Sequence, residues 1–152
     1  MDRRRILERI DIFKGLSPEE LDPIAELCEP RKCKASEVIF AEKSKGKEVY
    51  IVTKGRVRIE LGIKGKTDCA TIHRVGEGEI FGELAIVGEG RRSGTAKCET
   101  DCEVIAINRD ALRDLFERQT RIGYVVMMNL ASLVATRLRK TNLQLVACFL
   151  WE

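Results

Sequence analysis

Residues 49–61 read Val49-Tyr50-Ile51-Val52-Thr53-Lys54-Gly55-Arg56-Val57-Arg58-Ile59-Glu60-Leu61. The first four residues form a continuous apolar run, which is typical of a buried strand, and Lys54-Gly55 is a turn signal. After this turn, apolar and charged side chains alternate, as they do in a strand with one buried face. The stretch therefore predicts two successive strands joined by a tight turn.

This alternation of apolar and polar side chains, with a period of two residues, extends outward over residues 31–109. Ala70/Ile72 and Val104/Ala106 belong to further predicted strands. Many short strands with regular turns predict a sandwich or barrel rather than a parallel sheet. The turn signals are glycines, and they stand at Gly46, Gly55, Gly62, Gly65, Gly76, Gly78, Gly82, Gly88, Gly90 and Gly94.

Residues 1–30, before the strand region, show a helical pattern. Ser17-Pro18-Glu19-Glu20 has the form of a capping box with proline at the first helical position. Pro23 should kink this helix or keep it short. We therefore expect a helical lead-in to the strand region.

Residues 110–152, after the strands, return to a helical pattern. Asn108 or Asp110 is expected to cap a first helix. A longer helix follows, and two apolar stripes predict that one face covers the strand domain while the other meets a second copy of the chain. The alternative is that both stripes pack inside one chain. The first stripe consists of Tyr124, Met127, Ala131, Val134, Leu138, Thr141, Leu145 and Cys148, and the second of Ile122, Val126, Leu130 and Leu133.

Length and composition limit the classes of protein that this chain can represent. Its 152 residues suit one domain spanning 1–152, and the net charge of +3 is too small to indicate a polyanion-binding protein. His73 is the only histidine, which excludes a multi-histidine metal site.

The start of the chain is charged, and no apolar stretch approaches the ~20 residues that cross a bilayer. We therefore expect a cytoplasmic protein, without a membrane partner, whose thiols stay reduced. Its cysteines are interpreted as small buried hydrophobic residues, with a redox-sensitive pair as the alternative. They are Cys28, Cys33, Cys69, Cys98, Cys102 and Cys148.

The residues that carry chemistry lie between 78 and 96. A strand is expected to end at Phe81, and Gly82 allows a close backbone approach. Residues 84–87 can form one helical turn whose free amides attract an anion. Arg92 adds a guanidinium suited to two phosphate oxygens.

Glu83 is the unexpected member of this segment, since a carboxylate beside a phosphate site repels the anion. It fits the site if it accepts hydrogen bonds from a sugar hydroxyl. An acid and an arginine around a glycine-rich turn thus suit a ribose phosphate better than a bare phosphate. The simpler alternative is that Glu83 and Arg92 form a plain surface ion pair.

Residues 81–85 and 92–96 resemble the phosphate-binding cassette of cyclic nucleotide-binding domains. Such domains occur in protein kinase A regulatory subunits, cyclic-nucleotide-gated channels and bacterial catabolite activator proteins. Residues 13–17 resemble the helical lead-in of the family, residues 49–57 its central hairpin, and residues 137–142 the long helix of its bacterial members. One departure is Lys43-Ser44, where the family usually has Gly-Asp, and this changes a tight turn.

The resemblance implies a mainly β fold with flanking helices. This is a β-roll (a double-stranded β-helix, jelly-roll-like) over residues 31–109, with a helical lead-in at 1–30 and helices for dimerisation and ligand closure at 110–152. The ligand would be a cyclic purine nucleotide, cAMP or cGMP. No catalytic residue, metal or other cofactor is implied. The implied ligand-binding residues are Gly82, Glu83, Leu84, Ala85, Arg92, Ser93, Thr141 and Asn142.

Within this site, the resemblance gives each residue a role. Glu83 would accept from the ribose 2′-hydroxyl, and Arg92, with the Ser93 hydroxyl and the nearby amides, would hold the cyclic phosphate. Thr141 would bind the base together with Asn142, either of the same subunit or of the other one. Alternatively, Thr141 is only a tolerated polar residue in the first apolar stripe of the long helix.

Two function classes remain open. The first is a regulatory module that transmits cyclic nucleotide binding through its C-terminal helix. The second is a structural or adaptor dimer that has lost the ligand and recruits a protein through its apolar tail, residues 146–151. A cupin-like metalloenzyme lacks the necessary histidines, and a DNA-binding regulator is disfavoured because no helix-turn-helix follows by Glu152.

Overall fold

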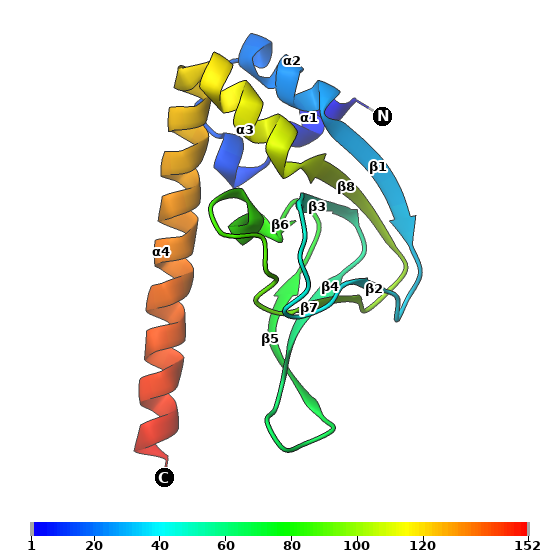
Figure 1. Cartoon of the computed structure of the whole chain (residues 1–152), viewed down its shortest axis with the longest axis vertical. Coiled ribbons are helices and arrows are strands. Elements are labelled where there is room, and N and C mark those ends of the chain that lie inside the picture. Colours follow the sequence, from blue (N-terminus) through cyan, green and yellow to red (C-terminus); the bar gives the residue numbers. More distant parts are fainter. Residues whose placement is uncertain (1, 152) are drawn as a thin grey trace.

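The structure, a computed structural model, describes residues 2–151, so the predicted domain limits at residues 1 and 152 lie outside the described residues. Helices occupy both ends of the chain and strands its middle (Figure 1). The helices are α1 (Arg3–Leu7), the 3-10 helix η1 (Asp11–Phe13), α2 (Pro18–Glu26), the 3-10 helix η2 (Glu83–Ile86), α3 (Arg109–Arg118) and α4 (Thr120–Leu150). The strands are β1 (Cys28–Cys33), β2 (Val38–Phe40), β3 (Glu48–Lys54), β4 (Val57–Gly62), β5 (Cys69–Val75), β6 (Ile80–Phe81), β7 (Thr95–Cys98) and β8 (Cys102–Asn108).

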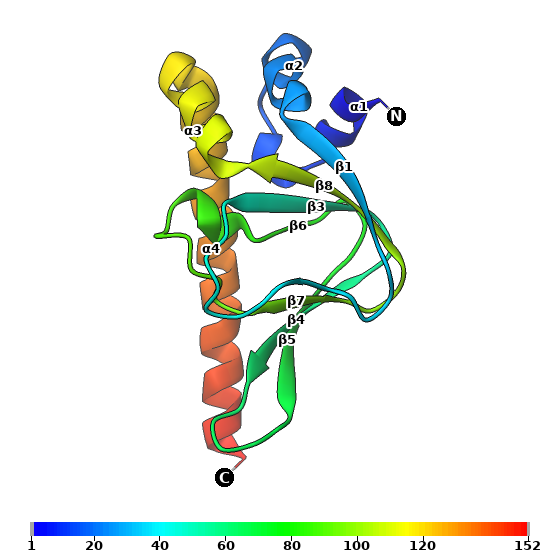
Figure 2. The same cartoon turned by 45° about the vertical axis from the view of Figure 1, so that its right-hand side comes forward.

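The strands form two antiparallel sheets that face each other as a roll (Figure 2). One sheet has the order β1-β8-β3-β6 and the other β2-β7-β4-β5. The predicted mainly β fold, a β-roll with flanking helices, is confirmed. The strand region begins at Cys28, earlier than the predicted residue 31, because β1 pairs with β8 along its whole length.

The central strands β3 and β8 are buried on both faces, which explains the continuous apolar run at residues 49–52. Val49 and Ile51 face the helices, and Tyr50 and Val52 face the interior of the roll. The core therefore consists of two clusters on opposite faces of one sheet.

The helix caps predicted from the sequence form. In α2, Ser17 and Glu20 hydrogen-bond reciprocally as a capping box, and the helix has only nine residues with Pro23 inside it. Of the two candidate caps for α3, Asn108 is the one that forms: its side chain accepts from the amide of Ala111, at 3.0 Å.

Helix α4 has a docked half and an exposed half. Ile122, Val126 and Leu130, from the second predicted stripe, are buried against the body of the domain. From Leu138 onward every described residue of α4 is exposed, and Trp151 at its end is 90% exposed. The two apolar stripes therefore do not both pack within this chain. The alternative that they do is wrong.

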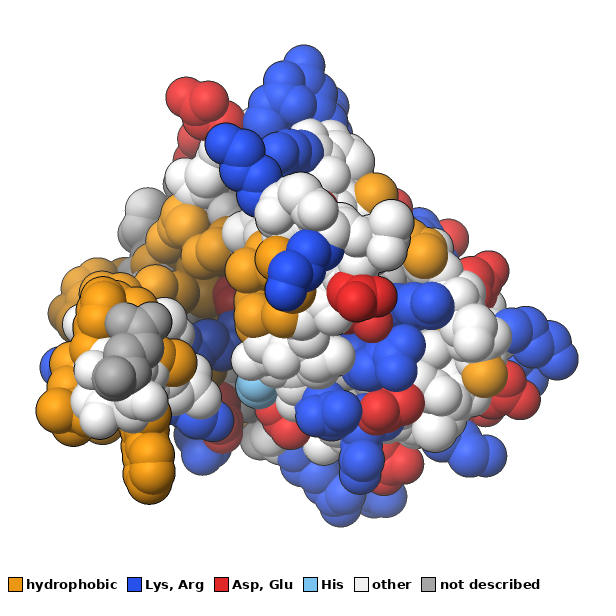
Figure 3. Space-filling view, turned by 90° about the horizontal axis from the view of Figure 1, so that it is seen from below, with side chains coloured by type: hydrophobic (Ala, Val, Ile, Leu, Met, Phe, Trp, Pro, Cys, Tyr) orange, Lys and Arg blue, Asp and Glu red, His pale blue; other side chains and the backbone are white. Residues whose placement is uncertain are grey.

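The exposed half carries a gathering of hydrophobic side chains, visible from below in Figure 3. None of the helices among residues 2–151 has the length and apolar character needed to cross a membrane.

Candidate functional site

A cavity of about 660 Å³ lies between the roll and α4. Its walls come from β4 and β5, from residues 81–85, from residues 91–94 and from α4. Figure 3 shows the hollow between the exposed part of the helix and the roll. Segments far apart in the sequence thus meet around one space.

The floor of this cavity is the turn that follows β6. Gly82 has a φ of +70°, the left-handed region that favours glycine, and its carbonyl accepts from the amide of Ala85 at 3.2 Å. This starts η2 at Glu83, one residue before the predicted turn. The first amides of such a turn have no partner within the turn itself.

Arg92 lines the cavity and is only 6% exposed. Its guanidinium lies 4.1 Å from the centre of the Phe40 ring, and its Nη1 donates to the Gly82 carbonyl at 3.4 Å. Its Nε is buried without a hydrogen-bond partner, and Arg92 forms no salt bridge with any residue from 2 to 151. A buried cation is therefore held next to the cavity without a neutralising carboxylate.

The backbone around Arg92 is fixed by the loop before β3. The Arg92 amide donates to the carbonyl of Ser44 and its carbonyl accepts from the amide of Lys43, both at 2.8 Å. Lys43 has a φ of +66°, so the departure from the family's glycine retains a left-handed turn. A Cβ at Gly46 would overlap the guanidinium, so this glycine gives Arg92 its space.

The nearby carboxylate of Glu48 attracts Arg92 through its charge but forms no salt bridge with it, because its hydrogen bonds go to other groups. It accepts from Arg31 Nη1 and from the Tyr50 hydroxyl, each at 2.6 Å. The Arg31 hydrogen bond lowers the pKa of Glu48, and burial with the Glu48 contact raises the pKa of Tyr50 to about 12. Burial also lowers the pKa of Arg92, although an arginine stays charged.

Glu83 also lines the cavity, is 6% exposed and has a partner. Arg137 of α4 donates from Nη1 to the Glu83 carboxylate and from Nη2 to the Ile80 carbonyl, the latter at 3.3 Å. Glu83 and Arg92 are therefore not a surface ion pair, and that alternative is wrong. Instead, an ion pair joins the roll to α4.

Seven of the eight predicted residues line the cavity. Thr141 is one of them, and its hydroxyl donates to the Arg137 carbonyl at 2.9 Å. Asn142 is exposed and is not among the lining residues. The seven are Gly82, Glu83, Leu84, Ala85, Arg92, Ser93 and Thr141.

The predictions missed other residues that also line the cavity. On α4 these are Arg137, Lys140 and Gln144. Together with Thr141 they repeat at spacings of three and four residues, which lie on one helix face, so this signal was present in the sequence. The lining residue His73 of β5 gave no such signal, because its place depends on strand pairing.

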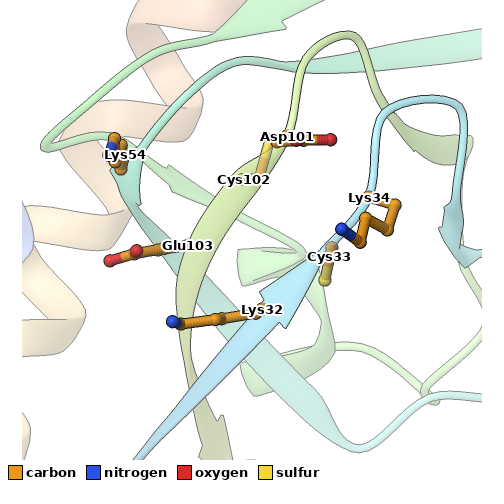
Figure 4. A pocket seen from close by; sticks show the side chains of 7 residues that line it. All are labelled: Lys32, Cys33, Lys34, Lys54, Asp101, Cys102 and Glu103. Atoms are coloured by element: carbon orange, nitrogen blue, oxygen red, sulfur yellow. The ribbon is translucent and has the colours of Figure 1, made fainter.

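Another cavity, of about 300 Å³, lies at the end of β1 and the start of β8 (Figure 4). Burial raises the pKa of the Cys33 thiol, which lines this cavity, and the pKa of Cys98 nearby. Protonated thiols are weak nucleophiles. Among residues 2–151 no cluster of three ligands could hold a metal. This cavity therefore offers little chemistry.

The interpretation of the cysteines as buried residues is correct for Cys28, Cys98 and Cys102. It is wrong for Cys69 and Cys148, which are exposed on the edge strand β5 and on the exposed part of α4.

Comparisons with known proteins agree on one family. The profile of the "Cyclic nucleotide-binding domain" matches residues 30–119. The chain is 34% identical over 134 residues to the cyclic AMP receptor protein of Thermus thermophilus, covering 88% of this chain and 60% of that protein. It thus spans about three fifths of that relative.

Solved structures give the same result. The catabolite activator protein of Thermus thermophilus superposes with a TM-score of 0.77 at 34% identity, over 89% of this chain and 61% of that one. The regulatory domain of Toxoplasma gondii PKA, crystallised with cAMP, superposes with a TM-score of 0.69 at 26% identity, over 74% and 42%.

Proposed function

This chain belongs to the cyclic nucleotide-binding domain family, and on that premise we propose that it is a regulatory module that binds cyclic AMP between its β-roll and α4. One observation carries the proposal: Arg92 is a buried cation beside the cavity, without a carboxylate partner. Burying an unpaired charge is costly, so a ligand that supplies the negative charge is strongly favoured.

The ligand's cyclic phosphate would meet the guanidinium of Arg92. A phosphate diester carries one negative charge and two free oxygens, which match the paired donors of an arginine. Ser93 and the first residues of η2 also line the cavity, and the Ser93 hydroxyl and these amides would add neutral donors. These groups would surround the phosphate without further charge.

Glu83 would accept a hydrogen bond from the ribose 2′-hydroxyl. In the free protein the same carboxylate is bound by Arg137 of α4. The ribose must therefore share Glu83 with Arg137 or displace it, and either change alters how α4 is held. A ligand shifts such an equilibrium only through a contact that differs between the two states, and this contact is of that kind.

The base would be distinguished by Thr141. Because its hydroxyl proton is donated to the Arg137 carbonyl, its oxygen is left as an acceptor. Adenine presents an amino group at position 6, whereas guanine presents a carbonyl oxygen there. An acceptor favours the amino group, which supports cAMP over cGMP.

We further propose that two copies associate through the exposed half of α4 and that Asn142 meets the ligand of the partner copy. The exposed apolar side chains of this half, such as Leu145 at 55% exposure, support the association. Sedimentation of the wild-type chain as a dimer and of Leu145→Glu as a monomer is the expected result. A wild-type monomer, with or without cAMP, would contradict it. Cytoplasmic location and a role without catalysis remain predictions.

Calorimetric titration with cAMP, cGMP and 5′-AMP tests the proposed ligand. We expect cAMP to bind best, and Arg92→Ala to lose a charge-assisted contact worth ~1.5–3 kcal/mol, or about 10- to 150-fold in Kd. Arg56→Ala is the matched control, since Arg56 is an exposed arginine on the roll outside the cavity. It should bind like the wild type.

Thr141→Val extends the titration to the base. It should weaken cAMP binding while leaving cGMP binding unchanged. If the wild-type chain binds none of the three nucleotides, the structural or adaptor dimer becomes the better reading. If Arg92→Ala binds cAMP as tightly as the wild type, the phosphate is not held by Arg92.

A further inference from the structure

Arg113 of α3 holds the chain segment that follows η2. Its Nε donates to the Ile86 carbonyl at 2.8 Å, and its Nη2 donates to the Gly88 carbonyl at 3.5 Å. Ile86 is the last residue of η2, where the backbone carbonyls have no partner within the turn itself. The guanidinium of α3 therefore satisfies carbonyls that the short turn leaves free.

A second arginine of α3 packs on the same segment. Arg109 lies four residues before Arg113, and this spacing places both side chains on one face of the helix. A Cβ at Gly90 would lie only 2.9 Å from Arg109 Nη1, and Gly90 has a φ of +85°. The segment thus runs against Arg109 at a position that favours glycine. One face of α3 therefore fixes the segment from residue 86 to residue 90.

This segment supports the guanidinium of Arg92. Gly90 precedes Arg92 by two residues, and its carbonyl accepts from the amide of Gly46 at 2.7 Å. Gly46 is the glycine that gives the Arg92 guanidinium its space. A shift of the segment would therefore move the backbone against which the Arg92 side chain rests.

The link from α3 differs from the link that α4 makes to the same turn. In the proposed function the ribose competes with Arg137 for Glu83, so the contact from α4 changes when the ligand enters. Arg113 is not among the residues that line the cavity, and it holds backbone carbonyls at the far end of η2. No group of the ligand competes for it, so this link can persist in the free and in the bound state.

Resting on the proposed function, we propose that Arg113 is a positioning residue: it does not touch the ligand, but it keeps residues 86–90, and through them Arg92, in place for the cyclic phosphate. The affinity for cAMP therefore depends on hydrogen bonds made outside the cavity. Arginine suits this role because its rigid guanidinium can donate to two carbonyls at once.

Calorimetric titration of the intact chain with cAMP tests this role. Arg113→Met keeps a long side chain but removes the donors, and it should bind about three- to tenfold more weakly, the range of one ordinary hydrogen bond. Arg113→Lys retains a charged donor and should recover most of the loss. Arg118→Met is the matched control, since Arg118 is exposed and donates to the Asp114 carbonyl of its own helix. It should bind like the wild type.

A double-mutant cycle separates the positioning of Arg92 from a general loosening of the fold. If Arg113 acts through Arg92, adding Arg113→Met to Arg92→Ala should weaken binding by less than about twofold further, because the positioned side chain is already absent. A further loss as large as in the wild-type background would contradict the proposal. Thermal melting verifies that each variant is folded at the titration temperature. Arg113→Gln, too short to reach both carbonyls, replaces Arg113→Met if the latter is not folded.

The outcomes distinguish this inference from the proposed function. If the wild type binds cAMP and Arg113→Met binds it as tightly, only the role of Arg113 is overturned. The same holds if Arg113→Lys loses as much affinity as Arg113→Met, because the loss is then not due to the donated hydrogen bond. If the wild type binds no cyclic nucleotide, the proposed function fails and the inference with it.

Discussion

The two buried charged residues that line the cavity, Arg92 and Glu83, differ in how they are paired. Arg92 is held by the roll alone, through the backbone of Lys43 and Ser44, and its charge has no salt-bridge partner among the described residues. Glu83 is neutralised by Arg137, which belongs to α4. The Arg92 side, here called the rigid or unpaired end, can thus supply binding energy, and the Glu83 side, here called the paired end, links ligand binding to the position of a helix.

The largest effect we expect comes from undocking α4. Leu130→Ala removes a side chain that is 1% exposed, and such truncations lower the free energy of unfolding by ~2–5 kcal/mol. Met128→Ala, on the solvent-facing side of the same helix at 55% exposure and outside the exposed half, should change it by less than ~0.5 kcal/mol. Denaturant unfolding measures both, and equal losses would show that α4 is not docked through this buried face.

The next largest effect on stability is expected from a substitution at the paired end, Glu83. Glu83→Gln removes the negative partner of Arg137 and leaves part of a buried polar contact unmade, which costs ~1–3 kcal/mol of the free energy of unfolding. We expect a lower melting temperature in the absence of any ligand. Glu117→Gln, at an exposed position of α3, is the control and should melt like the wild type.

A substitution at the unpaired end, Arg92, should change the free energy of unfolding in the opposite direction. Arg92→Met replaces a desolvated cation by an apolar side chain, so the free energy of unfolding should stay the same or rise by about 1 kcal/mol. Binding of cAMP should be lost in the same variant. A destabilisation as large as that of Glu83→Gln would remove the distinction between the two ends.

The smallest effect is a pH dependence of the stability, and it comes from Glu48 near Arg92. Because the Arg31 hydrogen bond lowers the pKa of Glu48 in the folded state, its contribution to stability is present above pH ~4.5. This contribution is lost as the pH falls from there through the folded-state pKa. Melting between pH 6 and 3 should therefore show a shallower acid decline for Glu48→Gln than for the wild type. Identical slopes would exclude this contribution.

The sequence predicts the features that depend on neighbours along the chain. The strands around Gly55 and the caps at Ser17 and Asn108 follow from local period and local hydrogen bonding. The start of β1 at Cys28 does not, because residues 28–33 lack a clear alternation and become a strand only by pairing with β8. Pairing across the fold overrides local pattern there.

The same distinction holds for the site. Glu83 and Arg92 are nine residues apart in one glycine-rich segment, so their common place in the cavity could be predicted. The partner of Glu83 lies 54 residues further on, and His73 enters the cavity through the register of β5 with β4. Neither contact leaves a local pattern, so both required the three-dimensional structure.

The end of α4 carries a built-in optical reporter. Trp151 is the only tryptophan of the chain, and it stands almost fully in solvent. Its fluorescence therefore describes the helix tip alone, with no background from the core. A shift of its emission to shorter wavelength on addition of cyclic AMP, or on raising the protein concentration, would reveal without any label when that tip becomes covered.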